Sequence, residues 1–112
     1  MAGTAPEIWV FGDYRNYFQN RVTLQLLSRA TDLADRIGAT VCATVFGHQT
    51  DEWVGEYIAH GARKVYLVEH EALRYYSSDI YVALMDRLAR QYGPEIILVG
   101  ATSFGREFAP RV

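Results

Sequence analysis

Short apolar runs alternate with longer stretches of helical period along the chain. The apolar runs occupy residues 8–11, 41–46, 65–68 and 96–99, and each is followed by a glycine or a polar residue. Strands that are apolar on both faces belong in a sheet covered on both sides, which usually means a parallel sheet. The pattern therefore predicts four buried strands in the order β-α-β-α-β-α-β-α.

The segment between the first two runs carries the clearest helical pattern. Its apolar residues recur on one helical face, and Gly38 follows them as a C-terminal cap. This face is formed by Val22, Leu26, Leu27, Ala30, Leu33, Ala34 and Ile37. Residues 12–21, which precede the face, are interpreted as the loop that joins the first strand to this helix.

A second helix is predicted from about residue 51 to residue 60. Thr50 is its expected N-cap, Asp51 and Glu52 suit its positive N-terminus, and Gly61 ends it. The side chains expected to face inward are Trp53, Val54, Tyr57 and Ile58.

A third helix is predicted to begin near Ser77 or Ser78 and to stop at Gly93-Pro94. Its apolar and aromatic residues at helical spacing are Ile80, Tyr81, Leu84, Met85, Leu88 and Tyr92. A fourth helix is indicated after the last strand, because Phe104, Phe108 and Val112 recur at four-residue steps. The chain is expected to be truncated within that helix.

These elements predict a three-layer α/β/α sandwich. Right-handed crossovers between parallel strands place helices on both faces of the sheet, although periodicity leaves the strand order open. The carboxyl ends of all strands lie along one edge, where ligands and partners are met. That edge is expected to gather Gly12-Asp13, Gly47-His48, Glu69-His70 and residues 100–105.

Composition favours a single domain and gives no sign of a nucleic-acid or membrane partner. The chain has 112 residues, of which 50% are hydrophobic, and a net charge of -2. This balance excludes an electrostatic footprint for nucleic acid or an anionic membrane. No signal peptide or apolar stretch of membrane length is present. Cys42 is the single cysteine, so a reducing compartment is natural and the cytoplasm is expected.

The common nucleotide motifs are not found. The loop after the first strand has one glycine, Gly12, where a dinucleotide fingerprint needs three. A P-loop fails as well, because the only lysine, Lys64, precedes a strand without the required glycines. Asp13 and Glu69 do not make the acid cluster of a phospho-acceptor receiver domain.

Metal and nucleophile chemistry find little support in the sequence. His48, His60 and His70 have no ligand spacing among them, so no metal site is expected. Cys42 lies inside a predicted strand, where thiols are normally inert packing. Ser103 has no evident base nearby in the sequence, and no catalytic residue is assigned.

Two features remain as candidate binding elements. The aromatic residues Tyr14, Tyr17, Phe18, Tyr75 and Tyr76 suit a core edge or a partner surface better than a stack on a flavin or a base. Gly100, Thr102, Ser103, Gly105 and Arg106 suit either a nest of amide donors for an anion or an ordinary helix cap. The cap, by Thr102 or Ser103 with Glu107 in the first turn, is the favoured interpretation.

The final segment resembles a known family. Residues 94–112 read P-E-I-I-L-V-G-A-T-S-F-G-R-E-F-A-P-R-V, which is similar to the P-E-I-I-L-x-G-A-T-x-x-G-R-[DE]-L-A-P-R-[IV] segment of electron transfer flavoprotein alpha subunits. Phe108 stands where that family often has leucine. The opening strand, Gly47-His48 and residues 60–66 agree as well, with Arg63 in place of a frequent acidic residue.

The resemblance implies a subunit of an electron carrier. Family members pair an alpha with a beta subunit, hold FAD, and carry electrons from flavin dehydrogenases, such as acyl-CoA dehydrogenases, to a quinone reductase or other acceptors. The FAD domain lies beyond the N-terminal domain, which is Rossmann-like and related to adenine nucleotide alpha hydrolases. AMP or a second FAD resides in the beta subunit.

Residues 1–112 are therefore expected to form the N-terminal domain alone, without the C-terminal FAD domain. The resemblance implies a scaffold and docking role with no catalytic activity and no cofactor of its own. The alternative is a stand-alone adenine-nucleotide-binding domain that uses residues 100–106.

Overall fold

The structure, a computed structural model, describes residues 5–75 and 77–100. Its elements are β1 (Glu7–Phe11), α1 (Tyr17–Ile37), β2 (Thr40–Gly47), α2 (Asp51–Ala59), β3 (Lys64–Glu69), the 3-10 turn η1 (Glu71–Leu73), α3 (Ser78–Tyr92) and β4 (Ile96–Leu98). The strands form one all-parallel sheet in the order β3-β2-β1-β4. The predicted α/β alternation is confirmed for these elements, while the fourth helix falls outside the described residues.

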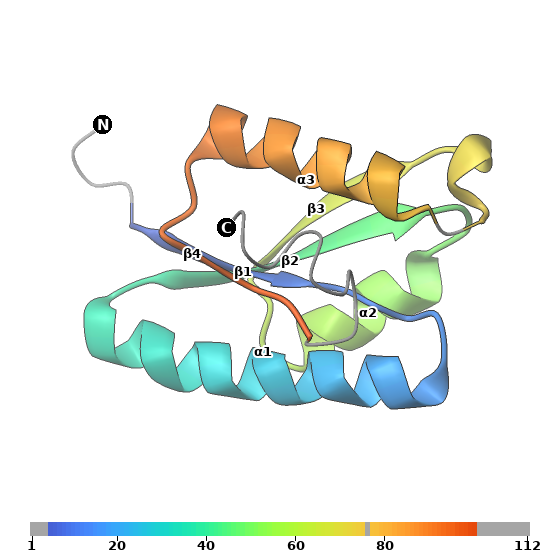
Figure 1. The fold of residues 1–112 in the computed structure, drawn as a ribbon. Coiled ribbons are helices and arrows are strands. Elements are labelled where there is room, and N and C mark those ends of the chain that lie inside the picture. Colours follow the sequence, from blue (N-terminus) through green and yellow to red (C-terminus); the bar gives the residue numbers. More distant parts are fainter. Residues whose placement is uncertain (1–4, 76, 101–112) are drawn as a thin grey trace.

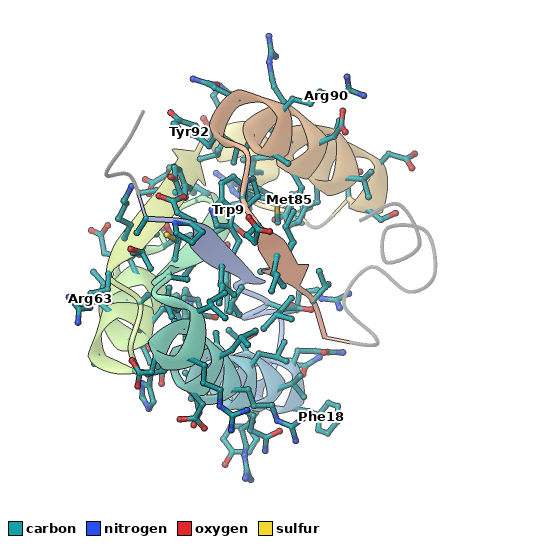
Figure 2. All side chains as sticks on the ribbon, turned by 90° about the vertical axis from the view of Figure 1, so that its left-hand side faces the viewer. Trp9, Phe18, Arg63, Met85, Arg90 and Tyr92 are labelled. Atoms are coloured by element: carbon teal, nitrogen blue, oxygen red, sulfur yellow. The ribbon has the colours of Figure 1, made fainter. Side chains whose placement is uncertain are left out.

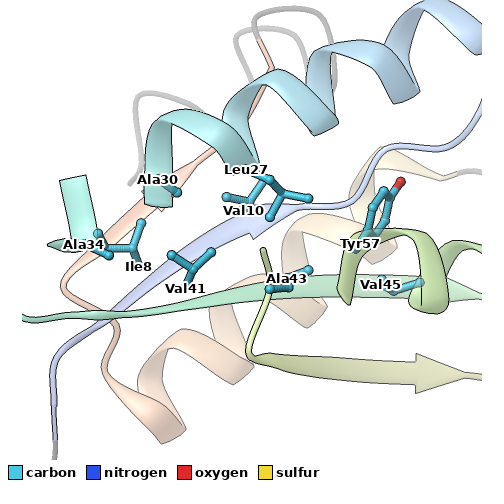
Figure 3. Close-up of a cluster of buried hydrophobic side chains, with 10 residues drawn as sticks. Ile8, Val10, Leu27, Ala30, Ala34, Val41, Ala43, Val45 and Tyr57 are labelled. Atoms are coloured by element: carbon cyan, nitrogen blue, oxygen red, sulfur yellow. The ribbon is translucent and has the colours of Figure 1, made fainter. Parts of the chain in front are cut away.

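Helices cover both faces of the sheet, as the apolar strands predict (Figure 1). On one face, side chains of β1 and β2 pack beneath α1 and α2 (Figure 3). The buried members of this cluster are Ile8, Val10, Leu27, Ala30, Ala34, Val41, Ala43, Val45, Tyr57 and Ala62. The fold is therefore the expected three-layer sandwich.

The opposite face packs against α3 and η1. Its buried members are Trp9, Phe11, Cys42, Phe46, Leu73, Tyr81, Val82 and Met85. Figure 2 shows Trp9 and Met85 between the sheet and α3, whereas Phe18, Arg63 and Arg90 extend outward. Alternate residues of each strand thus serve opposite clusters, which explains why the strands are apolar throughout.

Helix α1 begins earlier than the apolar stripe predicts. Asn16 is its N-cap and accepts a hydrogen bond from the Gln19 N–H at 2.9 Å, so the helix starts at Tyr17 within the expected loop. This correction follows from the Asn cap, which satisfies an N–H group that the first turn leaves unpaired. The predicted C-terminus is confirmed, because Gly38 adopts the left-handed conformation with a φ of 71°.

The inward assignment of Ile58 on α2 is wrong, and two apolar-stripe residues of α3 are also partly exposed. Ile58 is 53% exposed, Ile80 is 46% exposed and Tyr92 is 49% exposed. Thr50 is the N-cap of α2 by position, but its hydroxyl donates to Glu69 Oε1 at 3.3 Å and makes no capping bond.

Two buried threonines differ in whether their side-chain hydroxyl makes a hydrogen bond, so together they test what such a bond contributes to stability. Thr44 Oγ1 is buried with no hydrogen-bond partner among the described residues, whereas Thr23 Oγ1 accepts the Asp13 N–H at 3.0 Å. We expect Thr44→Val to stabilise the domain by about 1 kcal/mol, because it removes a buried polar group of similar shape. Thr23→Val should destabilise it by about 1–2 kcal/mol, because the Asp13 N–H loses its acceptor.

Urea unfolding of the two variants beside the parent chain measures both effects. Equal changes of the same sign in the two variants would contradict this account of the two hydroxyls.

Candidate functional site

The loops that follow the strands meet at the carboxyl edge of the sheet. Tyr14 Oη donates to the Phe46 carbonyl at 2.8 Å, which joins the loop after β1 to the end of β2. The His70 N–H donates to the Gly47 carbonyl at 2.9 Å, which joins β2 to the end of β3. The predicted gathering of Gly12-Asp13, Gly47-His48 and Glu69-His70 is confirmed.

The strand order places a topological switch point at this edge. The chain moves outward from β1 to β3 and then returns to the other side of β1 with β4. In open α/β sheets, the crevice at such a point is the usual ligand position. Gly12 ends β1 at this crevice, and Gly100, which is buried, follows β4.

Asp13 is the most buried carboxylate at the edge, at 3% exposed. Arg15 holds it in a two-point contact, with Nε to Oδ1 at 2.9 Å and Nη2 to Oδ2 at 2.8 Å. A bidentate guanidinium satisfies a carboxylate in both charge and geometry. Asp13 is therefore a positioning group for the loop.

Three backbone N–H groups of the loop after β1 already donate hydrogen bonds to acceptors within the domain. The Gly12 N–H donates to the Thr44 carbonyl at 2.8 Å, and the Asp13 N–H donates to Thr23 Oγ1. The Arg15 N–H donates to Asp13 Oδ1 at 3.3 Å. A pyrophosphate needs amides of this kind to be directed at it. With these three engaged and a buried carboxylate beside them, the loop does not fit the pyrophosphate of FAD.

A hollow of about 300 Å³ lies beside this loop, on the α3 side of the sheet. It is lined by Phe11, Gly12, Asp13, Tyr14, Arg15, Leu73, Arg74 and Tyr81. Its two arginines are both paired, since Arg74 Nη2 contacts Glu71 Oε2 at 3.2 Å and Arg15 contacts Asp13. The volume is at the lower end of ligand pockets, so the hollow is too small for a whole FAD.

A larger hollow of about 610 Å³ opens between the start of α1 and α2. The rings of Tyr14 and Trp53 stack at its wall, 5.5 Å apart with an interplanar angle of 14°. Burial raises the pKa of Tyr14 to about 12, so its hydroxyl stays protonated and donates to Phe46. Tyr17 at the rim and its neighbour Phe18 are 77% and 65% exposed. Arg21 lies over the Tyr17 ring at 5.8 Å.

Asn20 and Glu56, which line this hollow, belong to a polar network that the sequence did not predict. Tyr57 Oη donates to Asn20 Oδ1 at 2.6 Å, and Asn20 Nδ2 donates to Glu56 Oε1 at 2.9 Å. This network fixes α1 against α2. The available signal was Asn20, a polar residue one turn after the Asn16 cap and on the face that Thr23 and Leu27 continue.

Cys42 is packing, as predicted from its place in a strand. Its side chain is fully buried, and burial raises the pKa of the thiol to about 12. A thiol is nucleophilic only as the thiolate. Cys42 therefore belongs to the α3-side cluster and carries no chemistry at the edge.

The described ranges contain neither a metal-ligand cluster nor a helix that could span a membrane. Among residues 5–75 and 77–100, His, Cys, Asp and Glu side chains form no group of three that suits a metal ion. Within the same ranges, none of the helices combines the length and the apolar character needed to span a bilayer. Thr102, Ser103, Gly105 and Arg106 of the predicted nest lie outside the described residues, so the choice between nest and cap stays a prediction.

Together, the parallel sheet, the switch point and the internally satisfied loop define a Rossmann-like α/β domain that resembles a nucleotide-binding fold without its phosphate loop. Residues 8–112 match the family described as "Electron transfer flavoprotein domain". The chain belongs to this family.

The curated relatives give the same result. The chain is 38% identical to the electron transfer flavoprotein subunit alpha of Thermoanaerobacterium thermosaccharolyticum over 95% of its length and 32% of the relative's. Identity to the subunit alpha of Megasphaera elsdenii is 38% over 81% of the chain and 27% of the relative. The acryloyl-CoA reductase electron transfer subunit beta of Anaerotignum propionicum is 33% identical over 94% of the chain and 29% of the relative. The chain thus spans about a third of the length of these relatives.

Proposed function

We propose that residues 1–112 act in electron transfer as the N-terminal scaffold and docking domain of an electron transfer flavoprotein alpha subunit. The proposal rests on the family match and on relatives whose names specify subunits of an electron carrier. The partner is a beta subunit, and the heterodimer takes electrons from flavin dehydrogenases and delivers them to a quinone reductase or another acceptor. This domain contributes a surface and takes no catalytic step.

The cofactor of such a carrier is FAD, which supplies the electron-accepting flavin ring. The described residues do not fit it, because the amides after β1 are engaged and the neighbouring hollow is small. We place the FAD site in another part of the alpha subunit, and AMP or a second FAD in the beta subunit.

The exposed aromatic rim of the larger hollow is the observation that supports docking most directly. Tyr17 and Phe18 expose most of their surface although aromatic rings are the residues that gain most from burial. Arg21 stands beside them, and aromatic residues and arginine are enriched where proteins meet. We assign the rim, defined as Tyr17, Phe18 and Arg21, to the contact with the beta subunit.

Phe18→Ala tests this assignment in the complex with the beta subunit. We expect the dissociation constant to rise about tenfold, because an exposed aromatic anchor at an interface is worth more than 1 kcal/mol on truncation. Isothermal titration calorimetry measures it after co-expression has shown that the subunits associate. Tyr75→Ala is the matched control, since Tyr75 is 77% exposed in the segment after η1 and is not part of the rim.

Failure of the subunits to associate would count against the docking role. An effect of Tyr75→Ala as large as that of Phe18→Ala would count against the rim. The alternative function, binding of an adenine nucleotide by residues 100–106, stays a prediction that calorimetric titration with AMP and ATP tests.

A further inference from the structure

Strand β3 is an edge of the sheet with an open side. Among the described residues it pairs only with β2, and it is six residues long, twice the length of β4 at the other edge. The His70 N–H donates to the Gly47 carbonyl of β2. The Thr44 carbonyl of β2 faces β1, where it accepts the Gly12 N–H, so those of Ala43, Val45 and Gly47 face β3. Their register partners Val65, Leu67 and Glu69 therefore direct their amides away from β2.

The side chains along this edge are those of a strand that is not fully covered. Leu67 is 44% exposed, and Ile58 on the neighbouring helix α2 is 53% exposed. Arg63 precedes the strand, extends into solvent and makes no ion pair with the described residues (Figure 2). A free edge with exposed apolar side chains is a template for another strand.

The residues along β3 are complementary in charge and in apolar character to a second, antiparallel copy of the same strand. Directly opposed residues of an antiparallel pair have their side chains on the same face of the sheet. When a strand pairs with its own copy, the two-fold axis therefore lies at a residue and not between two residues. In the register centred on Tyr66, Arg63 opposes the second copy's Glu69 and Val65 opposes the second copy's Leu67. Both pairs occur twice, because the two-fold axis repeats them.

We propose that β3 pairs antiparallel with β3 of a second copy of this chain, about a two-fold axis at Tyr66. Val65 and Leu67, whose amides point outward, then exchange backbone hydrogen bonds across the axis. On the face that α2 covers, the registers centred on Val65 or Leu67 set a charge against an apolar side chain: Arg63 against Leu67, or Val65 against Glu69. The opposite charges of Arg63 and Glu69 on this face favour the register centred on Tyr66, which sets Lys64 against Val68 on the other face.

This self-association is independent of the proposed electron transfer role. A six-residue strand pair with Ile58 beside it is smaller than the interfaces of permanent dimers. The dimer is therefore expected to be weak and to depend on protein concentration. Its two halves are identical surfaces, so it closes and does not grow into a fibre.

Charge reversal tests the pairing through sedimentation equilibrium over a wide concentration range. R63E and E69R should each weaken the dimer about tenfold, because each replaces two attractive pairs by two repulsive ones. An equimolar mixture of R63E with E69R should regain the affinity of the parent chain, because all opposed charges again differ in sign. R87E is the matched control, an equal charge change at an exposed position on α3.

The parent chain remaining a monomer at millimolar concentration would overturn the proposal, as would a dimer that R63E and E69R leave unchanged. Melting temperatures of the variants establish that they fold. Amide exchange followed by NMR on the parent chain gives a second readout that needs no variant. Dilution should expose the amides of Val65 and Leu67, while Tyr66 and Val68 stay protected by β2. Equal exchange of Val65 and Leu67 at all concentrations would likewise overturn the proposal.

Discussion

Gly12→Ala is expected to destabilise the domain by about 3 kcal/mol, the upper range for overpacking in a core. A Cβ at this position would lie 2.6 Å from Tyr57 Cε2 and 2.9 Å from the Thr44 carbonyl oxygen. The carbonyl belongs to the central strand β2 and cannot move, while Tyr57 is held by its bond to Asn20. Urea unfolding followed by circular dichroism measures the loss.

Gly55→Ala is the control for this prediction. Gly55 lies inside α2, where an added Cβ meets no atom within 4 Å. Alanine is the better helix former by about 1 kcal/mol, so this variant should be more stable than the parent chain. A Gly12→Ala variant as stable as the parent would show that the end of β1 is not as tightly packed as the structure describes.

Glu7→Ala is expected to cost about 2–3 kcal/mol, because the carboxylate of Glu7 accepts three hydrogen bonds at the amino edge of the sheet. The donors are Lys64 Nζ at 2.6 Å, Tyr66 Oη at 2.7 Å and Trp9 Nε1 at 2.9 Å. Trp9 is fully buried, so its N–H would lose its acceptor away from water. Thermal and urea unfolding measure the change, and Glu95→Ala, at an exposed position, should stay within about 0.5 kcal/mol of the parent.

The effect of Glu7→Ala also depends on pH. Burial acts to raise the pKa of Glu7, but the hydrogen bonds from Lys64, Trp9 and Tyr66 outweigh it and hold the pKa below its ordinary value. A carboxyl group with a lowered pKa stabilises the fold fully above its unfolded pKa of about 4.3 and loses this contribution as the pH falls through its folded pKa. The difference between the parent chain and Glu7→Ala should therefore be constant near neutrality and shrink in acid. A difference that grows in acid would contradict the assignment.

The elements could be predicted from the sequence because their signals are local. Gly38 and Gly93 end their helices in the left-handed conformation, and apolar runs mark the strands. The start of α1 was missed because exposed aromatic residues, Tyr17 and Phe18, occupy its first turn and hide the helical period. Asn16 alone signals the boundary, and a single cap residue is also common in turns.

The site was harder to predict, because its geometry depends on contacts between distant segments. The edge itself follows from parallel strands, so Gly12-Asp13 and Gly47-His48 could be placed together. The hydrogen bond between Asn20 and Tyr57 joins residues 37 positions apart, so it cannot be predicted from the periodicity of either helix. Strand order likewise depends on which strands pair, and the apolar runs of β1 and β2 are compatible with several orders.

The two indole rings of this chain divide between the layers of the sandwich. Trp9 is sealed beneath α3, where Tyr66 and Tyr92 lie 4.7 and 6.5 Å from it between ring centres. Trp53 lies on the other side of the sheet, half-buried in the wall that it shares with Tyr14. Each layer therefore contains one intrinsic fluorophore in a distinct environment, and single-tryptophan variants would reveal whether the two sides of the sheet melt as one cooperative unit.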